Sequence, residues 1–170
     1  MRQKRRELEQ RLARHHDAAF GWALTCCGGE FAEAEDVLQE AYLRMLSGKA
    51  RFEGRSGFRT FLFGVVRRIA SERRRRAVRR RRLLGRFRPE PATAPMRGDE
   101  VVARGERTLR IQAALATLSD RQREVLHLVF YEDMTVDAAA GVLGISIGSA
   151  RTHYARGKAR LSDLLAGGDR

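Results

Sequence analysis

The sequence contains very little cysteine. Only two of its 170 residues are cysteines, and they are neighbours, Cys26 and Cys27. Adjacent cysteines supply neither a disulfide framework nor a zinc site, because both need further partners at set spacings along the chain. We interpret the pair as small core residues at the end of a helix.

Long apolar runs and catalytic motifs are also missing. No signal-peptide stretch follows the basic start MRQKRRELEQRLARHH, and no run could span a bilayer, so we expect a cytoplasmic protein without stable membrane insertion. We see no phosphate loop or nucleophile motif, and the histidines form no ligand set. We therefore expect no enzymatic activity, no cofactor and no metal. The histidines are His15, His16, His127 and His153.

Arginine, by contrast, is abundant. The chain has 34 Lys and Arg against 21 Asp and Glu, a formal charge of +13, which predicts attraction to phosphate or to an anionic membrane surface. Residues 67–88, RRIASERRRRAVRRRRLLGRFR, hold twelve arginines and a single acid, Glu72. A helix is favoured for 67–76. For 79–88 a continuing helix and an unfolded basic arm both remain open.

All three prolines lie in residues 83–106, which predicts a flexible linker there. The predicted units on either side are residues 1–82 and 107–170. Their apolar residues follow helical rather than strand periodicity, so we expect an all-α fold of two small domains.

In the first unit, three helices are predicted. The first has an apolar face that extends from Leu8 to Ala23, and it ends at Gly28 and Gly29. The second runs from near Ala34 to Gly48. The inner face of the third is predicted to contain Phe58, Phe61, Leu62, Val65 and Ile69.

In the second unit, Ser119 and Gln122 fit a capping box at the start of a helix that buries apolar residues. These are Val125, Leu128 and Val129. A short helix over 136–143, a turn at Gly144 and a second helix near Ile147, capped by Ser146, then form a helix-turn-helix. The basic and hydroxyl side chains of the second helix favour DNA binding over a purely structural hairpin.

Two segments of the sequence resemble the same protein family. LATLSDRQREVLHLVFYEDMTVDAAAGVLGISIGSARTHYARGKARL resembles region 4, the promoter-reading domain of extracytoplasmic-function (ECF) sigma factors of bacterial RNA polymerase. AEDVLQEAYLRML followed by FEGRSGFRTFLFGVVRRIASERRRR resembles region 2 of the same family. The resemblance implies binding to core polymerase, at the β′ clamp helices and the β flap, and to promoter DNA.

The resemblance also implies three sets of site residues. The set that would bind core polymerase is Asp36, Gln39, Glu40 and Arg44. The set that would bind and help melt the minus-ten element is Phe52, Arg55, Ser56, Arg59, Thr60, Arg67, Arg68, Arg73, Arg74 and Arg75. The set that would read the minus-35 element is Ser149, Arg151, Thr152, His153 and Arg156.

An anti-sigma factor that covers regions 2 and 4 is a further partner that the resemblance implies. The alternative function is a stand-alone helix-turn-helix regulator that binds duplex DNA without polymerase. That alternative leaves the first 80 residues of the chain unexplained.

Overall fold

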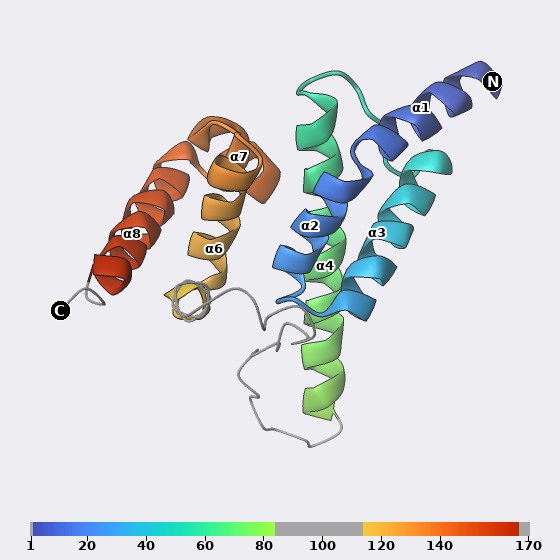
Figure 1. Cartoon of the computed structure of the whole chain (residues 1–170). Coiled ribbons are helices and arrows are strands. Elements are labelled where there is room, and N and C mark those ends of the chain that lie inside the picture. Colours follow the sequence, from blue (N-terminus) through green and yellow to red (C-terminus); the bar gives the residue numbers. More distant parts are fainter. Residues whose placement is uncertain (1, 84–113, 167–170) are drawn as a thin grey trace, which may run out of the picture. The chain divides into compact units, whose positions relative to one another are not determined.

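The computed structural model describes residues 2–83 and 114–166, which form two compact helical units (Figure 1). All regular structure within these two ranges is helical, so the all-α prediction is confirmed. Almost all of the predicted linker, 83–106, lies outside the described residues, as do Arg86 and Arg88. None of the described helices is both long enough and apolar enough to cross a membrane.

The N-terminal unit contains α1 (Arg2–Arg14), α2 (His16–Cys26), α3 (Phe31–Leu46) and α4 (Phe58–Leu83). Helices α2, α3 and α4 pack against one another in all three pairings, and α1 contacts α2 and α3. The glycines that were predicted to end helices do so, since Gly28, Gly29 and Gly48 have φ of +68°, +89° and +76°. Glycine adopts such angles without the strain that a Cβ would bring.

Trp22 lies at the centre of this unit and was not singled out from the sequence. Its side chain is fully buried, and its indole Nε1 donates a hydrogen bond to the carbonyl oxygen of Phe63 at 3.0 Å. The two rings stack with centroids 5.9 Å apart. This contact joins α2 to α4, and it satisfies the only polar atom of a side chain that is otherwise apolar.

The prediction of one continuous first helix was wrong, because the chain breaks at His15. That residue has φ −107° and ψ 11°, and its N–H bonds to the carbonyl of Leu12 in a tighter turn. The break changes the direction of the chain, so that Leu12 on α1 and Ala19 on α2 both reach the core.

The inner face of α4 was also predicted in part wrongly. Phe58, Leu62 and Ile69 are buried, but Phe61 and Val65 are only half-buried, whereas Phe63 and Val66 are buried. The first turns of α4 are apolar on almost every side, so periodicity could not fix which side faces inward. Helix α4 continues to Leu83, which confirms a helix over 67–76 and extends it through Arg82.

Both cysteines lie at the end of α2, as predicted. Cys26 is buried and Cys27 follows as the C-terminal cap. Burial is the main cause that raises the pKa of Cys27 to about 11, so this thiol stays protonated at neutral pH.

The C-terminal unit contains α6 (Asp120–Leu126), the π-helical segment η2 (His127–Tyr131), α7 (Val136–Leu143) and α8 (Ile147–Ala166). The capping box is confirmed: Gln122 N–H donates to Ser119 Oγ at 3.3 Å, and Ser119 N–H donates to Gln122 Oε1 at 3.1 Å. Val125 and Leu128 are buried as predicted, while Val129 is only half-buried. The π-helical segment had not been predicted.

A close approach of α6 and α8 also escaped the sequence reading. A Cβ at Gly157 would lie 2.9 Å from Leu126 Cδ1 and 3.2 Å from Gln122 Cβ. Glycine at this position therefore lets the two helices meet at short range, where a larger side chain would force its neighbours to move.

Candidate functional site

The helix-turn-helix forms as the sequence predicts. Thr135 Oγ1 accepts from Ala138 N–H at 3.1 Å at the start of α7, and Gly144 ends that helix with φ +62°. Ser146 Oγ accepts from Ser149 N–H at 3.1 Å and so caps α8. These local contacts fix the turn and both helix ends.

The predicted minus-35 residues lie along α8. Ala150, on its opposite side, is fully buried. Four of the five predicted residues are exposed and one, His153, is half-buried; the exposed ones are Ser149, Arg151, Thr152 and Arg156. Arg151 lies 3.5 Å from Asp137 Oδ1, but both side chains are more than half exposed, so this weak pair leaves the guanidinium accessible.

The loop before α4 carries three of the predicted minus-ten residues, Phe52, Arg55 and Ser56, and an aromatic cluster holds it. The ring of Phe52 lies 5.5 Å from that of Phe58 and 5.4 Å from that of Phe61, centroid to centroid. The guanidinium of Arg11 on α1 lies over two of these rings, 5.0 Å from Phe52 and 4.0 Å from Phe58. Arg11 was missed in the sequence, because nothing local indicates that α1 folds back onto this loop.

The other loop residues are more open. Arg55 is exposed and pairs with Glu53 at 2.8 Å, and Ser56 is exposed. Arg59 and Thr60 are half-buried in the first turn of α4. The pKa of His15 is lowered by burial first and then by nearby cations, with Arg59 foremost among them, so this end of the unit is cationic.

The predicted DNA-facing arginines of α4 differ in their surroundings. Arg68 and Arg75 are exposed, and Arg67 is half-buried. Arg74, also exposed, donates to the carbonyl of Cys26 at 3.3 Å. Arg73 turns to α3, where its guanidinium meets carboxylates.

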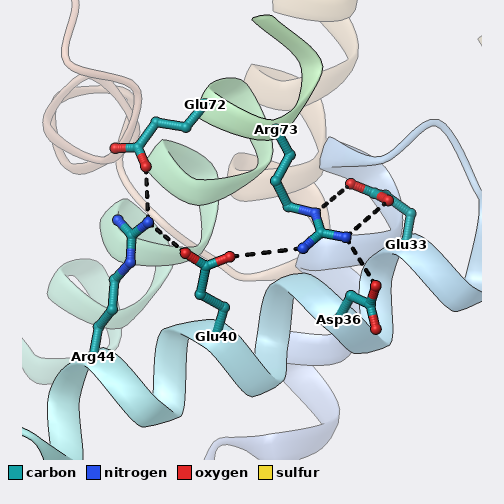
Figure 2. A network of polar contacts seen from close by, with 6 residues as sticks. All are labelled: Glu33, Asp36, Glu40, Arg44, Glu72 and Arg73. Atoms are coloured by element: carbon teal, nitrogen blue, oxygen red, sulfur yellow. Dashed lines mark hydrogen bonds and ion pairs between the residues drawn. The ribbon is translucent and has the colours of Figure 1, made fainter. Parts of the chain in front are cut away.

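Those carboxylates belong to a ladder of ion pairs between α3 and α4 (Figure 2). Glu72 Oε2 accepts from Arg44 Nη2 at 2.8 Å, and Arg44 also bonds to Glu40. Glu40 Oε2 lies 3.7 Å from Arg73 Nη1. The ladder ends where Arg73 donates to Glu33 Oε1 at 2.7 Å and to Asp36 Oδ2 at 2.8 Å.

The ladder brings together three of the four predicted polymerase-facing residues, Asp36, Glu40 and Arg44, while Gln39 is exposed beside it. The hydrogen bond from Arg44 is the largest cause that lowers the pKa of Glu72, and the same bond raises the pKa of Arg44. The hydrogen bond to Glu33 is the largest cause that raises the pKa of Arg73.

Glu33 and Glu72 were missed as parts of this site. One feature of the sequence could have indicated Glu72: it is the single acid in an arginine run, which predicts that it pairs with a specific cation.

Comparison with known proteins now bears on these surfaces. Residues 12–80 match the model of Sigma-70 region 2, and residues 108–161 match that of Sigma-70, region 4. The ECF RNA polymerase sigma factor SigL of Mycobacterium tuberculosis is 34% identical over 142 residues, which cover 79% of this chain and 76% of SigL. The chain belongs to the ECF sigma factors of RNA polymerase.

Other relatives of this ECF sigma factor agree. SigX of Bacillus subtilis is 32% identical over 129 residues, which cover 74% of this chain and 66% of SigX. RpoE of Bartonella quintana, solved with the anti-sigma factor NepR, matches with a TM-score of 0.71 and 25% identity, over 96% of this chain and 99% of that one. CnrH, solved with the cytosolic domain of CnrY, matches with a TM-score of 0.62 and 24% identity, over 97% and 90%.

Family membership confirms the resemblance in both units and makes this ECF sigma factor a transcription initiation factor rather than an enzyme. The individual site residues stay predictions, and so does the division into domains at 82 and 107.

Proposed function

We propose that the protein binds core RNA polymerase and directs transcription from specific promoters. In this proposal, the polar side of α3 meets the β′ clamp helices, and the 52–60 loop with the arginines of α4 holds the minus-ten strand. Helix α8 reads the minus-35 element in the major groove. The observation that carries the proposal is the exposed, capped row of polar residues on α8, in a chain that also contains a region 2 unit.

The electrostatics of the loop support the minus-ten part of the proposal. Capture of unstacked bases needs aromatic or cationic walls, which can repay about 1–3 kcal/mol per base. The loop provides the half-buried ring of Phe52, with the guanidinium of Arg11 5.0 Å from its centroid, together with the exposed Arg55. Phe52 is half-buried in its ring cluster, so we expect it to present an edge rather than a full face to a base.

Run-off transcription tests the proposal. Purified bacterial core polymerase is assayed with and without this protein, on genomic promoter fragments from its source, at two salt concentrations. Initiation that needs both components is the expected result. Tight binding to duplex DNA alone, without initiation, would contradict the proposal and would favour a stand-alone regulator.

Single substitutions on α8 test the minus-35 set. Arg151→Ala and Arg156→Ala should each weaken promoter binding by about 1–3 kcal/mol if they contact bases. A contact to phosphate would instead give a similar loss on every promoter. If both variants transcribe a cognate promoter as well as the wild type, these arginines do not belong to the site.

We also propose an anti-sigma partner and a cytoplasmic location. The solved complex of RpoE with the anti-sigma factor NepR supports the partner, because that RpoE chain shares this fold over nearly its whole length. A pull-down from the native cell should recover an inhibitor as well as polymerase. Recovery of polymerase alone would count against the inhibitor.

A further inference from the structure

Arg73 lies where α4 changes from a packed helix into a basic one. It continues the buried stripe of Leu62, Val66 and Ile69, at positions i, i+4, i+7 and i+11, so its side chain faces the bundle. The next arginines, Arg74 to Arg76, are exposed. Arg73 is therefore part of the arginine run that is predicted to face DNA, but its side chain lies against α3.

The contacts of Arg73 are divided unequally among three carboxylates (Figure 2). Glu33 takes two of them, from Nε at 2.7 Å and from Nη2 at 3.3 Å. Asp36 takes one at 2.8 Å, and Glu40 lies 3.7 Å away. The two-pronged pair with Glu33 is the geometry in which an arginine–carboxylate pair is strongest.

Two of these three acceptors have a second use. Asp36 and Glu40 belong to the face that the proposed function assigns to polymerase, and a cationic partner there would draw their charge away from Arg73. Glu33 lies one turn before Asp36 and outside that predicted set. It is therefore the one acceptor that docking leaves in place, so Arg73 is held more weakly once the other two are engaged.

We propose that Arg73 couples the polymerase-binding face of α3 to DNA binding by α4, with Glu33 as the residue that holds it back. In the free protein the three carboxylates keep the guanidinium on α3. Docking of a cationic surface on Asp36 and Glu40 loosens it, and it then joins its neighbours on α4 at DNA phosphates. This inference rests on the proposed function and adds its regulation.

The coupling must be reciprocal, because linkage requires two ligands to change each other's affinity by the same factor. Here polymerase would take the carboxylates and DNA would take Arg73, so each ligand frees the group that the other one binds. Polymerase should raise the affinity for DNA, and DNA should raise the affinity for polymerase. Half-exposed ion pairs of this kind shift an equilibrium by about 1.4-fold to fivefold each, so the expected effect is of that size.

The first test uses free protein and minus-ten DNA, and compares Glu33→Gln with Glu35→Gln. Both substitutions remove one negative charge from α3, but Glu35 is exposed and has no contact with Arg73 among the described residues. By fluorescence anisotropy, Glu33→Gln should bind DNA about two- to fivefold more tightly than Glu35→Gln. Its plot of log affinity against log salt should also be steeper, by about 0.9 for one added phosphate contact on duplex DNA.

Arg73→Gln provides the second arm. In a background that carries Arg73→Gln, Glu33→Gln should give no more DNA binding than Glu35→Gln gives. Circular dichroism melts check that each variant folds, and Arg73→Lys offers a milder change if Arg73→Gln does not. Equal DNA binding by Glu33→Gln and Glu35→Gln, with equal salt slopes, would overturn the proposal.

Core polymerase binding gives the third arm. Arg73→Gln frees Asp36 and Oε2 of Glu40, whose Oε1 still accepts from Arg44. It should leave the affinity for core unchanged or raise it up to about fivefold, while it weakens promoter binding by the holoenzyme. Loss of both affinities would show that Arg73 only supports the fold of α3, and would overturn the coupling. If the wild-type protein fails to bind core at all, the proposed function fails instead, and the Glu33 and Glu35 comparison still reports on Arg73.

Discussion

The two helical units satisfy their polar side chains in different ways. In the N-terminal unit the main contacts join residues far apart in sequence: Trp22 bonds to Phe63 across 41 positions, and Arg73 bonds to Glu33 across 40. In the C-terminal unit the helix starts are fixed by contacts across three positions, as between Ser119 and Gln122. The first kind of contact exists only after the helices have packed, whereas the second can form within a single turn. Local patterns in sequence therefore predict the C-terminal unit better.

The largest expected effect tests the contacts between helices in the N-terminal unit. Trp22→Ala removes a fully buried ring and its hydrogen bond to Phe63, and should lower the free energy of unfolding of the N-terminal unit by about 3–5 kcal/mol. Chemical denaturation followed by circular dichroism measures the loss. Leu43→Ala, at a residue that is 67% exposed, is the control and should stay within about 0.5 kcal/mol. Similar losses from both would mean that the core is not centred on Trp22.

His127 provides a test of a different kind, because its imidazole, 14% exposed, is a largely buried polar group in the C-terminal unit. Burial lowers its pKa to about 4, although Glu132 Oε1 lies 3.5 Å from Nε2 and favours the charged form. Between pH 6.5 and 4 the unfolded chain then binds more protons than the folded one, so stability falls as pH falls through this window. We expect a loss of about 1–3 kcal/mol, since each unit of pKa shift corresponds to about 1.4 kcal/mol.

Unfolding measured at a series of pH values tests this expectation, with His127→Gln beside the wild type. The variant should lose the part of the pH dependence that lies between pH 6.5 and 4. Identical pH dependence in both proteins would show that folding does not lower the pKa of His127, and would contradict this expectation.

A smaller effect tests the contacts within one helical turn that fix helix starts in the C-terminal unit. Ser119→Ala removes the acceptor of the Gln122 N–H and should cost about 0.5–2 kcal/mol in the stability of the C-terminal unit. Ser162→Ala, at an exposed position within α8, is the matched control and should change stability by no more than about 0.5 kcal/mol. If the two variants prove equally stable, the capping box does not fix the start of α6.

The smallest effect concerns the pair of Arg44 and Glu72. A double-mutant cycle with Arg44→Gln and Glu72→Gln should give a coupling of at most about 1 kcal/mol at neutral pH, because solvent screens these partly exposed side chains. The hydrogen bond from Arg44 lowers the pKa of Glu72. The coupling should therefore be complete above the unfolded pKa of about 4.5 and disappear as pH falls through the lower, folded value. A coupling that persists at pH 2 would contradict this assignment.

The residues that the sequence predicted well are those whose role depends on near neighbours. Ser119, Gly144 and Ser146 each act within one turn of the helix that they start or end, so their types alone carry the information. Exposure along α8 follows in the same way from its periodicity. The break at His15 was missed because no glycine or proline marks it in the sequence.

The parts of the site that escaped prediction depend on contacts between helices. Nothing near Arg11 indicates a ring beneath its guanidinium, and nothing near Glu33 indicates Arg73, 40 positions later. The inward face of α4 was mispredicted for another reason. Its first turns are apolar on almost every side, so only packing decides that Phe63 and Val66 point inward rather than Phe61 and Val65.

The far end of α4 has a consequence for its dynamics. After Arg74, every residue through Leu83 is exposed, so the last turns rely on the helix propensity of arginine and not on burial. Repulsion between arginines one turn apart works against them. In hydrogen exchange, amides near Ile69 should open only with the whole unit, whereas those after Val78 should open by fraying. A bound polyanion should slow the second group alone, so exchange along this one helix would show where phosphate binds.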